Sequence, residues 1–336
     1  MVEVSEESIT SIRETLSHFV SGVTGGRTID SDALTLTPIE KLRAAVVSEL
    51  ESSTLGVHLD LINAKNQFTF ACYVAADFTC SHPLEYQVIV AQLTIFFFHA
   101  EDILEGKPEV LRQLQLNVAT GQPTGDAVLD WYARELTPKL WKHFDPLVAN
   151  MIVIACYDFV NGIGIELLTK HAEVHREAPN FPDWLRFKTG LSPMYALLAL
   201  ARVSDPQLPT GGFEKFVQTI PDVIVFTNMV NDVISFYKEH LAGEKGNYID
   251  MRAHKDGVDV VVALRTVADE GICVRDRVLA ALADEPEYRD NFDAYAKGIT
   301  HFHTSSPRYR MVELFGTPTQ SSCTISESLS CGDCGI

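Results

Sequence analysis

Apolar residues recur along most of this chain at the three- and four-residue spacing of a helix that is buried on one face. Near the start, Ile9, Ile12 and Leu16 follow this spacing. A Gly-rich stretch, residues 22–27, then ends the first helical segment. Strand-like alternation bounded by turn residues occurs nowhere in the sequence. The pattern therefore predicts an all-α fold.

The same spacing along the whole chain predicts about a dozen helices that form one bundle. Proline and glycine residues separate many of them. The predicted helices cover residues 5–20, 38–52, 59–76, 83–104, 109–118, 126–144, 147–170, 213–240, 258–270, 275–283 and 286–302, and one more helix starts at residue 183.

Two places carry stronger local patterns than the periodicity alone. Thr37, Pro38 and Glu40 supply an N-cap, a first-turn proline and a capping-box glutamate, and so predict the start of a helix. Gly190 and Pro193 fall inside an otherwise helical segment, where both residue types are unfavourable. We therefore expect a broken helix between them, and a broken helix inside a bundle points to a function.

No internal repeat or linker divides the helices, so we expect one all-α domain that covers residues 1–318. Two domains remain an alternative that no feature of the sequence supports. Residues 319–336 are rich in Ser, Gly and Cys and carry no apolar period, which is the composition of a disordered tail. Cys331 and Cys334 offer two thiols without a second pair, which is a weak zinc pattern.

The composition narrows the class of protein. The chain of 336 residues is 46% hydrophobic and 21% charged, as expected of a soluble globular enzyme. Its formal net charge of -18 argues against nucleic acid or an anionic membrane as a partner, because both require clustered Lys and Arg. Residues 1–7 lack the basic and apolar regions of a secretion signal, so a cytoplasmic protein is expected. The most apolar stretch, residues 88–98, is too short to span a membrane and is predicted to be a buried helix.

A group of oxygen-bearing side chains lies near the end of the longest predicted helix. Asn231, Ser235 and Glu239 are four residues apart, and each such step turns about 400°, so the three side chains share one stripe. An amide, a hydroxyl and a carboxylate are hard-oxygen ligands, which favour Mg²⁺ over zinc. Lys238 lies on the adjoining face. A solvated helix face is the alternative, but the apolar run at residues 223–226 indicates that the helix begins in a core.

A second acidic group follows the aromatic run that ends at Phe98. Glu101 and Glu105 share one helix face, and Asp102 lies about 100° away, where it can pair with a cation on a neighbouring helix. The alternative is that these residues form an acidic helix end that simply faces water. Two helices that each place carboxylates at the end of a buried stretch nevertheless favour metal ions held between them.

Four side chains can complement these acids with positive charge or a hydroxyl. Arg186 precedes the predicted helix break, and Arg308 and Tyr309 lie near the end of the expected domain. A lone arginine usually extends into water. An arginine beside a phenol, however, offers several donors to one oxyanion. Together with Lys238, these residues can bind a diphosphate that the acids alone would repel.

The order of these motifs resembles that of the class I terpene synthases. The chain carries an acidic motif at Glu101, an arginine before a helix break, the sequence Asn-Asp-x-x-Ser-x-x-Lys-Glu from Asn231, and an Arg-Tyr pair at Arg308. The resemblance is greatest to the fungal trichodiene synthase-like sesquiterpene cyclases and covers roughly residues 35–315. It implies a single-domain helical bundle of the isoprenoid synthase type.

The resemblance also implies a metal site of three Mg²⁺ ions. Asn231, Ser235 and Glu239 would hold one ion, and the acidic motif would hold the other two. The family's first motif usually begins with two aspartates, whereas this chain has Glu101 followed by Asp102. We assign the leading ligand role to Glu101.

Further roles follow from the same resemblance. Asp102 would pair with Arg308, and Arg186 would sense the diphosphate. Thr189 and Gly190, at the predicted break, would be the linker and effector positions.

The implied activity is metal-triggered ionisation of farnesyl diphosphate, followed by cyclisation of the carbocation in a closed apolar cavity. Diphosphate would leave, and a sesquiterpene hydrocarbon or alcohol would form, without any side-chain nucleophile. Phe97 lies one helical turn before Glu101 and can offer a ring face to the cation, whereas Phe96 and Phe98 are expected to pack in the core. No nucleic acid or membrane partner is implied, and a homodimer is compatible with the sequence.

Two other functions remain open from the sequence. A non-catalytic helical protein could bind an isoprenyl diphosphate after decay of its first metal motif at Glu101. A chain-elongating prenyltransferase is disfavoured, because the later motif at Asn231 is of the Asn/Ser/Glu type and no second aspartate-rich motif occurs.

Overall fold

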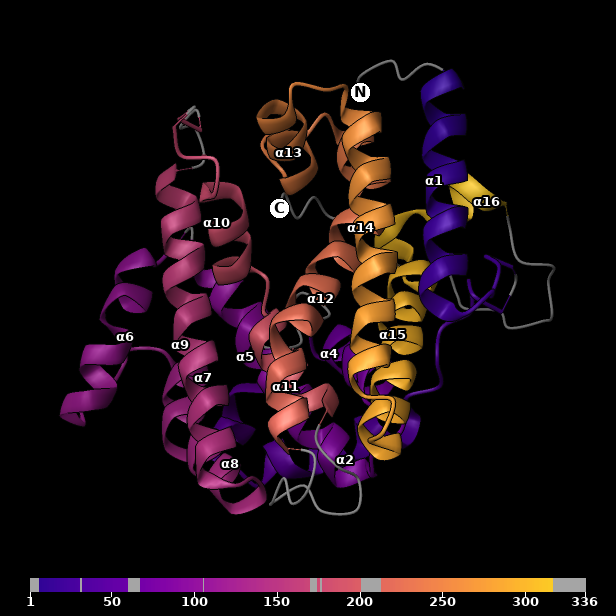
Figure 1. The fold of residues 1–336 in the computed structure, drawn as a ribbon. Helices are drawn as coiled ribbons and strands as arrows, with labels where there is room; N and C mark the ends of the chain where they lie inside the picture. Colours follow the sequence, from indigo (N-terminus) through magenta and orange to yellow (C-terminus); the bar gives the residue numbers. More distant parts are fainter. Residues whose placement is uncertain are drawn as a thin grey trace.

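A computed structural model of the chain describes residues 6–30, 32–59, 67–104, 106–169, 174–175, 177–200 and 213–316. Within these ranges every regular element is a helix, so the predicted all-α fold is confirmed (Figure 1). Three residues with predicted roles, Glu105, Cys331 and Cys334, lie outside the described residues.

The α-helices are, in chain order, α1 Glu6–Thr24, α2 Glu40–Glu51, α4 Gln67–Phe78, α5 Leu84–Leu104, α6 Pro108–Thr120, α7 Ala127–Trp131, α8 Thr137–His143, α9 Pro146–Thr169, α10 Phe181–Thr189, α11 Ser192–Leu200, α12 Phe213–Ala242, α13 Tyr248–Asp256, α14 Val260–Ala281, α15 Pro286–Ser305 and α16 Met311–Phe315. Two 3-10 helices, η1 Thr54–His58 and η3 Pro307–Tyr309, and a π-helix, η2 Tyr132–Leu136, lie between them. Most predicted helices therefore exist at close to their predicted positions.

The helix α12 runs through the middle of the bundle and packs against α11, α14 and α15 (Figure 1). The helices α5 to α10 lie on one side of it, and α1, α14 and α15 lie on the other. Near the middle of α12, Val223, Phe226 and Val230 are fully buried. The apolar run thus lies in the core, and the second half of the helix carries the oxygen-bearing stripe towards one end of the bundle.

Two element predictions near the C-terminal side are wrong. Residues 258–283 were expected to form two helices, but α14 is continuous through Gly271. A Cβ atom at Gly271 would lie 2.9 Å from Cε2 of Phe19, so the packing of α1 against α14 requires a small residue there. The short helix α13 was not predicted, because it buries only Ile249 and Ala253 and so lacks a long apolar stripe.

The predicted capping box is also wrong. The helix α2 begins at Glu40, and Ile39 at the N-cap position makes no side-chain capping bond. Thr37 instead donates its hydroxyl to Oδ1 of Asp77 at the end of α4, at 2.5 Å. His301 of α15 lies beside the same carboxylate, with Nδ1 3.2 Å from Oδ2. Thr37 therefore links three helices instead of capping one.

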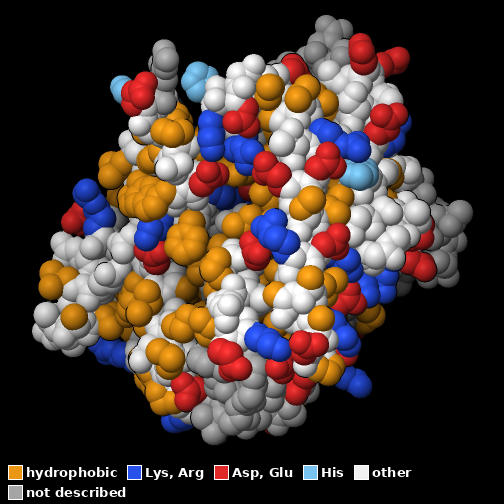
Figure 2. Space-filling view, viewed as in Figure 1, with side chains coloured by type: hydrophobic (Ala, Val, Ile, Leu, Met, Phe, Trp, Pro, Cys, Tyr) orange, Lys and Arg blue, Asp and Glu red, His pale blue; other side chains and the backbone are white. Residues whose placement is uncertain are grey.

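Two helices, α5 and α9, are long and apolar enough to cross a membrane by length and composition alone. The most apolar window of α5 is 72% buried, which agrees with its predicted place in the core. The corresponding window of α9 is only 39% buried. Leu147, Ile154 and Leu168 of α9 are exposed, and hydrophobic side chains gather on the side of the molecule formed by α6 to α10 (Figure 2).

Candidate active site

The predicted metal-binding stripe lies in the second half of α12. Ser235 is buried, and Asn231 and Glu239 are partly buried. The carboxylate of Glu239 accepts from Nζ of Lys238 at 3.0 Å and from Nδ2 of Asn247 at 3.1 Å. Because Asn247 also caps the start of α13, the Glu239 carboxylate is held at the junction of α12 and α13.

The side chain of Asn231 is oriented by a buried histidine. Nδ1 of His303 lies 2.7 Å from the carbonyl oxygen of Ile299, and a carbonyl can only accept, so this nitrogen carries the proton. Nε2 of His303 then accepts from Nδ2 of Asn231 at 3.1 Å. Burial is the largest cause that lowers the pKa of His303 to about 4, so the ring is neutral near pH 7. The amide oxygen of Asn231 is left to accept from Arg186 at 3.0 Å.

Arg186 makes a two-pronged ion pair with the neighbouring residue of the same motif. Its Nε lies 2.9 Å from Oδ2 of Asp232, and its Nη2 lies 2.9 Å from Oδ1. Only 17% of the Arg186 side chain and 10% of the Asp232 side chain are exposed. Burial raises the pKa of Asp232 to about 6, although the guanidinium opposes this shift. Arg186 therefore binds both Asn231 and Asp232 from across the α10–α12 contact.

The helix α10 is held in this position from the other side by α9. Lys188 forms an ion pair with Asp158 of α9, with Nζ 2.7 Å from Oδ1 and 2.8 Å from Oδ2. Gly162 of α9 lies against the backbone of α10, because a Cβ atom there would come 2.6 Å from the carbonyl oxygen of Lys188. This close approach lets α10 bring Arg186 to α12.

The predicted helix break is confirmed one turn after Arg186. The helix α10 ends at Thr189, and α11 begins at Ser192. Leu191 between them has a φ of 55°, in the left-handed region that a leucine rarely adopts. The Thr189 hydroxyl donates to the carbonyl oxygen of Leu185 at 3.2 Å and so stays within its own helix. Thr189 and Gly190 thus lie at the break, as predicted, while their linker and effector roles stay predictions.

The first acidic motif lies at the end of α5. Glu101 is partly buried, and burial raises its pKa to about 7, with Arg308 as the strongest opposing charge. Asp102 is exposed and accepts a hydrogen bond from Nε2 of Gln67, which also donates to the carbonyl oxygen of Phe98 at 3.3 Å. The structure thus places Arg308 near enough to Glu101 to act on its charge. The pairing of Asp102 with Arg308 stays a prediction.

Arg308 and Tyr309 lie on η3, directly after α15. Arg308 is exposed, whereas Tyr309 is buried and its ring centre lies 4.7 Å from that of His303. Burial raises the pKa of Tyr309 to about 12, so the phenol keeps its proton at neutral pH. The His303 ring therefore joins Tyr309 to Asn231, and these residues form one polar cluster with Arg186 and Asp232.

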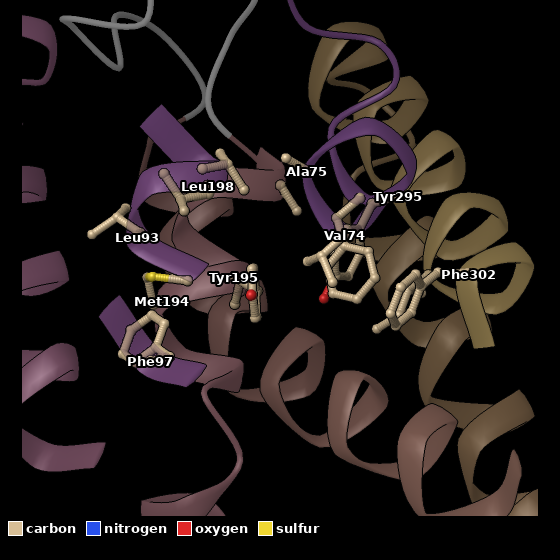
Figure 3. Close-up of a cluster of buried hydrophobic side chains, with 14 of the residues drawn as sticks. Val74, Ala75, Leu93, Phe97, Met194, Tyr195, Leu198, Tyr295 and Phe302 are labelled. Atoms are coloured by element: carbon tan, nitrogen blue, oxygen red, sulfur yellow. The ribbon is translucent and has the colours of Figure 1, made fainter. Parts of the chain in front are cut away.

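A cluster of buried hydrophobic side chains lies farther inside the bundle (Figure 3). Phe97 is fully buried and meets Phe159 edge to face, with ring centres 5.1 Å apart. Phe78 contacts Tyr195 and Tyr295 in the same geometry, at 5.0 Å and 5.7 Å. Each tyrosine hydroxyl is hydrogen-bonded to a threonine, with Tyr195 bonded to Thr94 at 2.8 Å and Tyr295 to Thr227 at 2.7 Å. Aromatic faces with few unpaired polar groups suit an apolar substrate.

The packing of Phe96 follows the sequence-based expectation. Its ring stacks on that of Tyr132 of η2, with ring centres 3.8 Å apart. Phe98 is partly buried against the core. Both residues therefore pack as structural side chains, whereas Phe97 faces Met194 and Tyr195 of α11 (Figure 3).

Three residues of this arrangement were missed by sequence reasoning. His303 and Asn247 each hold a predicted ligand, and Asn228 lies one turn before Asn231 on α12. For Asn247 a pattern was present, because Asn followed three residues later by Asp is typical of a helix start. Nothing local marks His303, since its contact with Asn231 depends on how α15 packs against α12.

Comparison with known proteins identifies the family of this chain. The sequence profile described as trichodiene synthase (TRI5) matches residues 101–326. The chain is 31% identical over 236 residues to the alpha-cuprenene synthase of Coprinopsis cinerea, which covers 70% of each chain. It is 28% identical over 255 residues to terpene synthase BipA of Cochliobolus sativus, which covers 74% of this chain and 75% of that protein.

A solved structure shows the same fold. The linalool/nerolidol synthase of Streptomyces clavuligerus, crystallised with 2-fluorogeranyl diphosphate, superposes with a TM-score of 0.64 at 16% identity and covers 81% of this chain and 96% of its own. At that identity the likeness concerns the fold alone. The profile match spans more than half of the sequence, and the fungal relatives are terpene synthases. This chain is therefore a terpene synthase that belongs to the trichodiene synthase family.

Proposed function

We propose that the protein is a Mg²⁺-dependent sesquiterpene cyclase, which ionises farnesyl diphosphate, cyclises the carbocation and releases diphosphate. One observation carries the proposal: Arg186 contacts Asn231 and Asp232 of the α12 motif at one end of a bundle whose interior is lined by aromatic rings. Such a site offers charge to a diphosphate and an apolar surface to an isoprenyl chain. The similarity to an alpha-cuprenene synthase supports this reading.

The donor set fits Mg²⁺. Among the described residues, no three His, Cys, Asp or Glu side chains come together as a complete metal site. The α12 stripe instead offers an amide, a hydroxyl and one carboxylate, from Asn231, Ser235 and Glu239. Mg²⁺ commonly takes one or two carboxylates and completes its coordination with water and substrate phosphates. We therefore propose that these three residues hold one ion and that Glu101 and Asp102 hold the others, so that the metal would neutralise charge on the leaving diphosphate.

The cationic residues of the chain would bind the diphosphate directly. Arg186, Lys238 and Arg308 can each donate charge-assisted hydrogen bonds to phosphate oxygens. Tyr309 can donate its phenolic proton, because its raised pKa keeps it protonated. These donors would stabilise the negative charge that develops on the leaving oxygen as the carbon–oxygen bond breaks.

The aromatic cluster would receive the hydrocarbon chain. Phe78 and Phe97 can present ring faces to a carbocation, and neither is a nucleophile that would capture it. The hydroxyls of Tyr195 and Tyr295 are occupied by their threonine partners. A chain folded against these rings is shielded from water, which favours cyclisation over early capture.

The proposal is tested by incubating the purified protein with farnesyl, geranyl and geranylgeranyl diphosphates and Mg²⁺. We expect release of inorganic diphosphate and cyclic fifteen-carbon volatiles from farnesyl diphosphate. Both should vanish with a chelator and return with added Mg²⁺. Binding of the three substrates without diphosphate release would instead identify the non-catalytic alternative, and full turnover in a metal-free preparation would contradict the proposed role of the α12 stripe.

A further inference from the structure

Arg186 of α10 and Gly190 directly after it both contact α12, at two places one helical turn apart. At the first, Arg186 binds Asp232. At the second, Gly190 lies against Asn228. Residues 186 and 190 are four apart on one helical path, and residues 228 and 232 are four apart on the other, so both contacts lie on the same facing stripes. A movement of Arg186 relative to α12 will therefore act on the second contact.

The second contact is close but chemically incomplete. Asn228 is only 7% exposed, and its Oδ1 has no hydrogen-bond partner among the described residues. A Cβ atom at Gly190 would lie 2.0 Å from this oxygen, so the amide is aimed directly at the glycine. The φ of Gly190 is -80°, which any residue adopts, so it is the space and not the backbone angle that requires glycine. The Gly190 N–H makes no backbone hydrogen bond with the described part of the chain.

The helix break between α10 and α11 contains a strained backbone and a buried hydroxyl without a hydrogen-bond partner among the described residues. Leu191 holds a left-handed backbone conformation. Ser192 is fully buried, and its hydroxyl lacks a partner among the described residues. A donor at Gly190, an acceptor at Asn228 and a strained residue thus meet at one junction, where a small rotation of the peptide chain would join donor to acceptor. Packing alone does not explain a polar residue here, because a leucine of similar size would fill position 228 without an unsatisfied oxygen.

We propose that Asn228 is a positioning residue, whose Oδ1 accepts the Gly190 N–H when Arg186 leaves Asp232 to bind diphosphate. The inference rests on the proposed function, since it takes diphosphate as the anion that attracts Arg186. Once bonded, Asn228 fixes the start of α11, and with it Met194 and Tyr195, which face the interior beside Phe97 (Figure 3). Binding of diphosphate at one end of the site would thereby fix the positions of the side chains that contact the hydrocarbon chain.

The test compares two variants at the same position. Asn228→Leu removes the acceptor and keeps the volume, whereas Asn228→Asp keeps an oxygen at the Oδ1 position. Thr137→Val is the matched control, because it also replaces a buried polar side chain by an apolar one, in α8 at the opposite end of α9 from α10 (Figure 1). For each protein, kcat and KM for diphosphate release and the product ratio are measured, together with the melting temperature.

We expect Asn228→Leu to lower kcat by about tenfold or more with little change in KM, and to shift products toward early-captured acyclic alcohols. Its melting temperature should not fall, because an unsatisfied buried oxygen is removed. Asn228→Asp should recover most of kcat, and Thr137→Val should behave as wild type. If Asn228→Leu keeps the wild-type kcat and product ratio, the proposal is wrong. If Asn228→Leu and Asn228→Asp lose activity and melting temperature together, the role is structural and the proposal is equally wrong.

A second measurement does not depend on turnover. Hydrogen exchange at the Gly190 amide is followed in wild type and in Asn228→Leu, before and after addition of Mg²⁺ with inorganic diphosphate. We expect exchange to slow by about tenfold or more in wild type only, because only there can the new bond form. Equal slowing in both proteins would overturn the inference. If wild type releases no diphosphate from any isoprenyl diphosphate, the proposed function fails, and the exchange result still decides the role of Asn228.

Discussion

The protonation state of His303 offers a quantitative test of the polar cluster. The ring is 3% exposed and uses both nitrogens as a neutral imidazole, donating to Ile299 and accepting from Asn231. A proton on Nε2 would remove the acceptor and would face Arg308, Lys238 and Arg186, all of which disfavour it. Burial is the largest contribution, and the pKa falls from 6.5 to about 4.

This shift makes folding stability depend on pH. As the pH falls below 6.5, the unfolded chain binds a proton at His303 before the folded chain does, so the free energy of unfolding decreases. The contribution is fully present above pH 6.5 and is lost as the pH falls towards 4, with a total of about 3 kcal/mol. Glu101 acts in the opposite direction, because its raised pKa of about 7 makes the folded chain lose stability as the pH rises from 4.5 towards 7. A variant that removes only His303 separates its effect on the free energy of unfolding from that of Glu101.

The variant that isolates this effect is His303→Phe, which keeps a ring of similar size. At pH 7 it should be less stable than wild type by about 1–3 kcal/mol, because Asn231 and Ile299 each lose a buried partner. At pH 5 the difference should shrink by about 2 kcal/mol, because the variant has no imidazole to protonate. Urea unfolding at both pH values measures the two free energies of unfolding.

A control variant on the same helix is Phe302→Leu. It removes buried volume next to His303 without a titratable group, so its stability loss should be equal at both pH values. If the loss in His303→Phe is likewise the same at pH 7 and pH 5, the folded and unfolded chains protonate His303 alike, so its pKa is not lowered and the assignment of a neutral ring that accepts from Asn231 is wrong.

Three further changes test the roles proposed for the chain. Glu239→Gln should lower turnover by orders of magnitude and change the melting temperature little, and equal loss of both in kinetic and thermal assays would favour a structural role. Glu101→Asp should keep measurable diphosphate release while Glu101→Ala abolishes it, and an unchanged Ala variant would remove Glu101 from the mechanism and leave Asp102 as the candidate ligand. Truncation after Pro318 should preserve folding and product formation, and a large loss of activity would show that the residues beyond it cover the site.

A helix could be predicted from the sequence where its own residues show the apolar spacing of a helix. The helices α5, α9 and α12 match their expected ranges because their apolar residues recur over several turns. The errors arose where a distant contact decides the local structure. Gly271 lies within a continuous α14, where close packing of Phe19 of α1 and not a helix end explains the glycine. Thr37 leaves its expected capping position, and Asp77 accepts its hydroxyl. Neither partner is near in the sequence.

The contacts of the candidate site also include some that the sequence could predict and some that it could not. Asn231, Ser235 and Glu239 could be grouped in advance, since one helix fixes their mutual positions. The contact of Arg186 with Asp232 could not, because it depends on how closely α10 approaches its neighbours, where Gly162 allows the approach to α9 and Gly190 the approach to α12. The sequence indicated that a cation and an acidic motif coexist, and tertiary packing decided which acid the cation meets.

The arrangement around Arg186 has a consequence for the order of binding. Its guanidinium donates to the same Asn231 oxygen that we propose as a metal ligand. Two cations that share one oxygen repel each other by several kcal/mol in a partly buried site, so a metal ion there favours the departure of the guanidinium towards an anion. By reciprocity, a diphosphate that attracts Arg186 strengthens metal binding at Asn231. Asp232 is then left buried without its cation. Because burial already raises its pKa to about 6, Asp232 takes up a proton more readily than an ordinary aspartate. This protonation limits the free-energy cost of moving Arg186 from Asp232 to the diphosphate.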